Sequence, residues 1–180
     1  VGLSIYSDSY EFYANEKGSG RQHRMLLDQL EKLLATPKET KQTDTTKFLH
    51  LIAEKIHRRS MIVLFTDMFQ SGDQEALFNA LQHLKHNKHK VVVFHIYDKE
   101  TELDFDFDSA PRKFIDLESG ETIDLYSDSI KEDYEKQVGS YFKEVEMRCA
   151  QNQIKYVPVS VSESFEKIMT TYLVEKQRFK

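Results

Sequence analysis

The sequence predicts an α/β fold: a doubly wound, mostly parallel sheet with helices on both faces. Two runs, residues 61–65 and 91–96, are apolar except for His95 and are typical of parallel strands that are covered on both faces. A helical repeat of Ala and Leu lies between them, so the three elements form a βαβ unit with a right-handed crossover. The length of 180 residues suits one domain, and no internal repeat or linker divides it.

The chain opens with a predicted hairpin and two amphipathic helices. Polar and apolar residues alternate in 3–5 and 10–12 around a short polar turn, which is the period of two paired strands. Apolar residues then recur with helical spacing in 25–34 and in 48–56. We expect the next element, the strand at 61–65, to lie in the interior of the sheet.

The elements that follow residue 65 are predicted from turn and capping signals. Ser71 with Gln74, and Ser129 with Glu132, match the capping box that opens a helix. Pro158 places the last strand at a sheet edge, where a missing amide donor does least harm. The later elements are, in order, an inserted hairpin (113–117 with 122–125), a long helix (129–149), a strand (154–161) and a closing helix (165–173).

Composition excludes several classes of function. The net charge of -5 gives no counterion-release drive towards nucleic acid. The uncharged apolar runs are far shorter than the ~20 residues that span a bilayer, so we expect no membrane-spanning segment in this chain. The single cysteine, Cys149, suits a reducing compartment, from which we expect a cytoplasmic location, and it lies on an apolar helix stripe typical of a core residue.

No catalytic motif is present. The chain has no Gly-x-x-x-x-Gly-Lys-Ser/Thr, no His-Glu-x-x-His and no Gly-x-Ser-x-Gly. We therefore expect no enzymatic turnover of nucleotides, peptides or esters.

Two polar segments are candidate sites. Asp67 directly follows the strand at 61–65, at the carboxyl edge where open α/β sheets bind ligands, although a helix cap or a solvated loop carboxylate fits that position as well. Residues 43–46 carry hydroxyl and carboxylate oxygens suited to a hard cation, or Asp44 simply caps the next helix.

Together these segments carry a family resemblance. Residues 43–49 and 58–67 resemble the threonine loop and the aspartate strand of von Willebrand factor A domains, and more closely those of the bacterial family called domain of unknown function 58. Residues 114–121, the helix ending near Cys149, and Tyr172 with Leu173 extend the resemblance over nearly the whole chain. It implies a von Willebrand A-like, Rossmann-like fold.

The resemblance also implies a metal ion-dependent adhesion site. In A domains an Asp-x-Ser-x-Ser loop, a threonine and an aspartate hold a divalent cation, usually magnesium, and the last two correspond to Thr43 and Asp67. No Asp-x-Ser-x-Ser occurs in this chain. Either the first strand and its loop precede Val1 in the sequence, or the metal site is incomplete. In the sheet of an A domain, such a strand would lie between the strand at 3–5 and the strand at 61–65. We therefore expect this chain to bind Mg²⁺ weakly or not at all.

The implied function is a protein-binding module that works with a MoxR-type AAA+ ATPase in assembly or chaperone-like processes. An acidic side chain of the partner would complete the cation site. The alternative is a receiver-like phosphoacceptor domain, in which the carboxylate of Asp67 takes a phosphoryl group and Lys99 serves as the lysine after a later strand.

Two further clusters are interpreted as solvated. His83, His86 and His89 are spaced i, i+3 and i+6, so the third turns away from the first two and a solvated helix end is favoured over a metal site. Residues 104–108 alternate Asp and Phe and would place three carboxylates on one side of a strand. They lack the glycine and the terminal Glu of an EF-hand loop, so an exposed acidic edge is expected.

Overall fold

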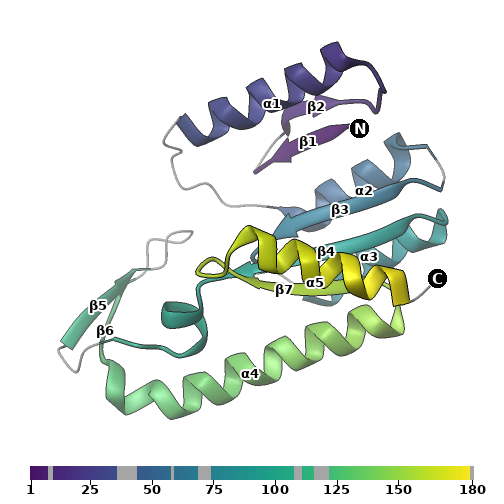
Figure 1. The fold of residues 1–180 in the computed structure, drawn as a ribbon. Coiled ribbons are helices and arrows are strands. Elements are labelled where there is room, and N and C mark those ends of the chain that lie inside the picture. Colours follow the sequence, from purple (N-terminus) through teal and green to yellow (C-terminus); the bar gives the residue numbers. More distant parts are fainter. Residues whose placement is uncertain are drawn as a thin grey trace.

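The computed structural model describes residues 1–7, 10–35, 44–57, 59–68, 74–107, 111–115 and 122–178. Its centre is a three-stranded parallel sheet in the order β3-β4-β7 (Figure 1). The strands are β3 (Met61–Thr66), β4 (Lys90–Tyr97) and β7 (Lys155–Ser160). The α/β class and the parallel βαβ unit are confirmed. The strand order does not reverse within the described residues, so a doubly wound arrangement is not confirmed.

The central strand is β4, not β3. Val92 of β4 pairs with Val63 of β3, and Phe94 pairs with Val157 of β7. Within the described chain β3 has β4 as its sole partner, so the prediction that this strand lies in the sheet interior is wrong there. Among the described strands β7 lies at the other edge of the sheet, as predicted from Pro158.

Helices cover the two faces of the sheet unequally. One face packs against α2 (Thr45–Lys55), α3 (Gln74–His86) and α4 (Ser127–Gln151) in the main core. On the other face α5 (Phe165–Arg178) lies over β4 and β7 (Figure 1). Its side chains pack against those of the two strands in a smaller core. Cys149 is fully buried in the main core, as predicted.

The predicted hairpin and first helix form a separate layer. Strands β1 (Leu3–Tyr6) and β2 (Tyr10–Ala14) pair antiparallel and are followed by α1 (Gly20–Ala35). Figure 1 shows β1 on the side of β3 that faces away from β4, and β1 does not pair with β3. The ring of Tyr6 stacks on Phe48 of α2 at 5.0 Å, which joins this layer to the main core.

The second half contains the predicted hairpin and two corrections. Strands β5 (Pro111–Ile115) and β6 (Thr122–Tyr126) pair antiparallel, which confirms the inserted hairpin. Helix α4 begins at Ser127, so Ser129 lies inside its first turn and the predicted capping box there is wrong. The other predicted capping box begins at Ser71, outside the described residues.

Residues 104–107 do not form the predicted strand. They follow a π-helical turn (Lys99–Leu103), and Phe105 is buried with its ring 4.4 Å from that of Tyr134. Phe105 has a positive φ of 45°, which does not fit a regular strand. Asp106 is exposed and Asp104 is half-buried, so these two carboxylates meet solvent as expected, although not from a strand; Asp108 lies outside the described residues.

Candidate functional site

Asp67 lies at the carboxyl end of β3, in a loop that its neighbours hold in place. The next residue, Met68, is buried and has a positive φ of 59°. Its amide donates to the Thr66 Oγ1 at 3.0 Å, and its carbonyl accepts a hydrogen bond from the Tyr141 hydroxyl at 2.6 Å. Because the amide and the carbonyl of Met68 are both hydrogen-bonded, the backbone next to the exposed Asp67 is held at the sheet edge.

The charge of Asp67 reaches three other side chains at this edge. Burial is the main cause that raises the pKa of Tyr6, and Asp67 adds to it while a hydrogen bond with Thr45 opposes it. Burial and the charge of Asp67 also raise the pKa of Tyr141, to about 12. These shifts place Tyr6, Tyr141 and Asp67 in one electrostatic neighbourhood, with both phenols protonated at neutral pH.

Glu102 belongs to the same neighbourhood. Burial chiefly raises the pKa of this carboxyl, the charges of Asp67 and Asp98 raise it further, and a hydrogen bond with the Asp98 backbone opposes them. Its Oε2 is buried with no hydrogen-bond partner. Nevertheless, no group of three or more His, Cys, Asp or Glu side chains in the described part of the chain is arranged to hold a metal ion.

The threonine segment meets this edge through its described residues. Thr43 lies outside the described residues, so its place beside Asp67 stays a prediction. Asp44 caps α2 by accepting a hydrogen bond from the Lys47 amide at 3.0 Å, which bears out the capping interpretation. The buried Thr45 forms a side-chain hydrogen bond with Tyr6, and the charge of Asp67 raises the pKa of that same tyrosine. The residues after Thr43 thus approach the same edge.

Lys99 is engaged elsewhere. Its Nζ lies 2.5 Å from Oδ2 of Asp104 in an exposed ion pair, and this hydrogen bond is the main cause that raises the pKa of Lys99. The lysine of the receiver alternative therefore has Asp104 as its bonded carboxylate.

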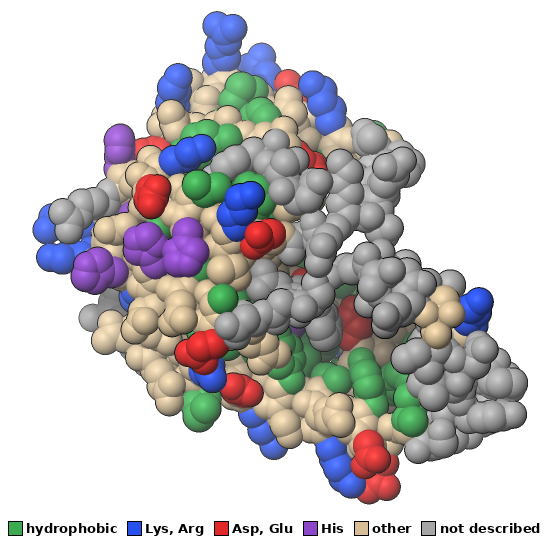
Figure 2. Space-filling view, turned by 180° about the vertical axis from the view of Figure 1, so that it is seen from behind, with side chains coloured by type: hydrophobic (Ala, Val, Ile, Leu, Met, Phe, Trp, Pro, Cys, Tyr) green, Lys and Arg blue, Asp and Glu red, His purple; other side chains and the backbone are tan. Residues whose placement is uncertain are grey.

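The three histidines of the predicted cluster do not share one environment, and His50, which the sequence analysis did not single out, lies beside one of them. His89 is buried, and its Nδ1 accepts a hydrogen bond from the Ser60 amide at 3.1 Å, so a solvated position is wrong for this residue. His83 and His86 lie on α3, and His83 Nδ1 lies 3.0 Å from the Nδ1 of His50 on α2. Figure 2 shows histidine side chains gathered on the surface at the back of the molecule. His50 is 33 positions from His83, so no local spacing signals the pair.

An exposed apolar face lies along β3. Met61, Val63 and Phe65 alternate along the strand and are 49%, 42% and 63% exposed. Phe65 stacks on Phe94 at 5.1 Å, and Phe94 in turn contacts Tyr172 of α5. The face is therefore the uncovered continuation of the small core beneath α5. We refer to Met61, Val63 and Phe65 as the β3 face.

Comparison of the sequence with known families identifies the family of this chain. Residues 1–167 match the family described as protein of unknown function DUF58. The chain belongs to this family. No curated protein and no solved structure matches this DUF58 chain. In its described residues, no helix has the length and apolarity needed to cross a membrane.

Proposed function

We propose that this DUF58 chain is a non-enzymatic protein-binding module whose partner docks along the free edge and apolar face of β3. One observation carries the proposal: β3 has an unpaired edge among the described strands and three exposed apolar side chains on one face. Unpaired backbone donors and acceptors are a template for another strand, and natural proteins usually blunt such an edge with charge or proline. Here the edge strand is apolar throughout residues 61–65.

The mode of binding is strand addition. An extended segment of the partner would hydrogen-bond to the β3 edge, and its alternate apolar side chains would cover the β3 face. Val63 and Phe65 would supply most of the buried apolar area, since buried aliphatic and aromatic side chains each contribute roughly 1.5–3 kcal/mol.

The proposed partner is a MoxR-type AAA+ ATPase. The support for this choice is the family resemblance described above, including that to von Willebrand A domains. In that resemblance Thr43 and Asp67 face the partner through a divalent cation, and a partner carboxylate completes the coordination. The position of Asp67 at the carboxyl end of β3, beside the proposed docking edge, is compatible with this arrangement.

The docking surface is tested by calorimetric titration of the full chain with a MoxR-type ATPase. Phe65→Lys places a charge in the β3 face and should weaken binding by at least ~10-fold, the equivalent of about 1.4 kcal/mol. Leu34→Lys is the matched control, because Leu34 is also apolar and is 89% exposed, but on α1. Binding that Phe65→Lys leaves unchanged, or no binding to the ATPase at all, contradicts the proposal.

The cation is tested separately by titration with Mg²⁺. Magnesium demands near-octahedral oxygen geometry and gives up water reluctantly, so two ligands from separate loops leave most of its shell to solvent. We expect this chain alone to bind Mg²⁺ weakly or not at all. Tight binding that Asp67→Ala abolishes would show that the site is complete without a further loop or partner.

The non-enzymatic assignment has its own test. The chain is incubated with a small phosphodonor, and its intact mass is measured. We expect no mass gain. A phosphoryl adduct that disappears in Asp67→Asn would favour the receiver-like alternative, because that residue would then be the nucleophile.

A further inference from the structure

Two histidines from different helices meet at the surface between α2 and α3. His50 and His83 are both half-buried, and their Nδ1 atoms are 3.0 Å apart. Their ring centroids are 5.2 Å apart and the ring planes are inclined by 44°. The two Nδ1 atoms thus face one another, while the rings are neither stacked nor coplanar.

This separation is close to that of two imidazoles on one metal ion. Zinc binds imidazole nitrogen at about 2.0–2.1 Å, so two ligands of a tetrahedral ion lie about 3.3 Å apart. We propose that His50 and His83 form a two-imidazole site for a borderline transition-metal ion such as Zn²⁺, with water or an added ligand in the remaining positions. Mg²⁺ is excluded as the occupant because it requires oxygen ligands.

The two helices hold the imidazoles in register. Leu49 and Ala53 of α2 and Leu81 and Leu84 of α3 are buried in the main core, so the residues that flank each histidine are fixed by packing. A hydrogen bond from the Asn87 side chain to the Ala53 carbonyl, 3.0 Å long, ties the end of α3 to α2. Ligands on rigid, packed elements bind a metal with little ordering cost.

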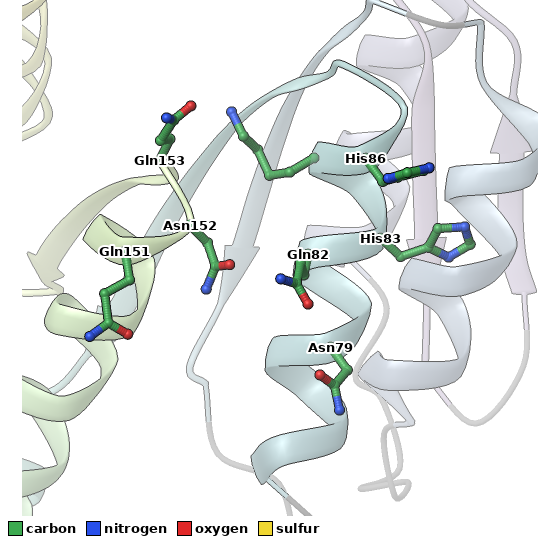
Figure 3. Close-up of a pocket in the computed structure, with 8 residues that line it drawn as sticks. Asn79, Gln82, His83, His86, Gln151, Asn152 and Gln153 are labelled. Carbon is green, nitrogen blue, oxygen red and sulfur yellow. The ribbon is translucent and has the colours of Figure 1, made fainter.

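The site opens to solvent. His83 lines a polar surface cleft of about 610 Å³, and Figure 3 shows its ring directed away from Gln151 and Asn152 on the far side of the cleft. The cleft is therefore on the other side of α3 from the two facing Nδ1 atoms, and access to the pair depends on the half-buried rings of His50 and His83 themselves. His86 also lines the cleft, one helical turn further along α3, but the contact between α2 and α3 involves His83.

The competing explanation is a simple hydrogen bond between two neutral imidazoles, because an N–H donor and a ring nitrogen acceptor also account for a 3.0 Å separation. The two explanations differ in their response to metal. A hydrogen-bonded pair alone has no Zn²⁺ affinity beyond that of an ordinary surface histidine.

The test is calorimetric titration of the full chain with Zn²⁺. His50→Asn and His83→Asn should each lower the affinity by roughly 10-fold or more, since even a lost second-shell partner costs 10- to 100-fold in metal affinity. His23→Asn, an exposed histidine of α1, is the matched control and should leave the affinity unchanged. Equal affinity in the wild type and in the variant lacking both histidines overturns the proposal.

A second measurement does not depend on folded variants. Long-range ¹H–¹⁵N spectra of the wild-type chain report the Nδ1 and Nε2 resonances of each imidazole. Addition of Zn²⁺ should shift the Nδ1 resonances of His50 and His83 together and saturably. If neither resonance responds to Zn²⁺, the pair is a hydrogen bond only. This proposal does not rest on the proposed docking function, and neither test affects the other.

Discussion

His95 is a histidine held where its charged form is unfavourable. It lies near the carboxyl end of β4 with no exposed surface, and its Nδ1 is 2.6 Å from the Tyr156 hydroxyl. Its ring stacks on Phe142 of α4 at 4.5 Å. Burial lowers the pKa of His95 to about 4, although an interaction with the Asp67 backbone acts in the opposite direction. The imidazole is therefore neutral at pH 7 and couples β4, β7 and α4.

This burial predicts a pH dependence of stability. Between pH 6.5 and about 4 the unfolded chain binds a proton at residue 95 that the folded chain does not, so the free energy of unfolding falls as the pH falls. The slope from this residue is at most ~1.4 kcal/mol per pH unit. Urea denaturation of wild type and His95→Gln across this range should show a shallower slope in the variant. His23→Gln is the control, and equal slopes in His95→Gln and wild type would contradict the prediction.

Cys149 gives a second prediction at this scale. Its side chain has no exposed surface, and burial raises the pKa of the thiol to about 11. Since the thiolate is the reactive form, Ellman's reagent at pH 8 should label the native chain only at the rate of unfolding. The thiol should react at once in guanidinium. Stoichiometric labelling of the native chain within the mixing time would be inconsistent with the buried position.

Local pattern explains why one of these residues was predictable and the other was not. Cys149 lies on the apolar stripe of α4, so its place in the core follows from the helical spacing of the apolar residues in that helix. His95 reads as a polar residue inside an apolar strand. Its partner Tyr156 is 61 positions away, and a contact at that separation leaves no local signal.

Two helix-to-strand connections share one backbone device. Lys88 follows α3 with φ 63° and leads into β4, and Gln153 follows α4 with φ 55° and leads into β7. The amide of Ile154 donates to the Cys149 carbonyl at 2.8 Å, and that of Gln153 to the Ala150 carbonyl at 3.0 Å. These bonds are typical of a helix that ends in a left-handed residue, a position that glycine occupies without strain.

The strain at residue 153 is open to a direct test. Gln153 is exposed, so its replacement removes no packing. Gln153→Gly should raise the free energy of unfolding by about 0.5–1 kcal/mol. A residue with a Cβ is strained by roughly 1–2 kcal/mol in this conformation, and the larger loss of chain entropy when glycine folds offsets part of the strain that is relieved. Gln153→Ala keeps the Cβ and should give no such gain in equilibrium denaturation. A glycine variant less stable than the alanine variant would contradict the argument.

The elements show why pattern predicted strands but not their places in the sheet. Residues 61–65 and 91–96 show the same buried-strand pattern, yet β4 has a partner on each side and β3 has one among the described strands. An apolar run indicates that both faces of a strand are to be buried, but it does not indicate which strands lie beside it in the sheet. The hairpin β5–β6 and the edge strand β7 were predictable because turn residues and Pro158 carry position-specific backbone restrictions.

At the scale of the whole molecule, the carboxyl edge was partly predictable. Asp67 could be placed there because a residue that follows a parallel strand must lie at that edge. Its companions Tyr6, Glu102 and Tyr141 come from three other parts of the chain, and only the assembled fold brings their charges and hydroxyls within reach of Asp67.

The β3 face also predicts how the chain behaves without a partner. The open edge of β3 and the exposed Met61, Val63 and Phe65 lie together, and a net charge of -5 provides modest repulsion between copies. Strand pairing and apolar burial should therefore drive reversible, concentration-dependent association that sulfate strengthens.

Sedimentation velocity across a concentration series measures this association. Phe65→Lys should lower the associated fraction, because a lysine on an edge strand must lose hydration before another copy can cover it. Leu34→Lys changes the net charge by the same amount and also replaces an exposed apolar side chain, but on α1, so it separates the effect of the β3 face from that of net charge. A chain that stays monomeric throughout, or one whose association responds equally to both substitutions, would show that the β3 face does not drive contacts between copies.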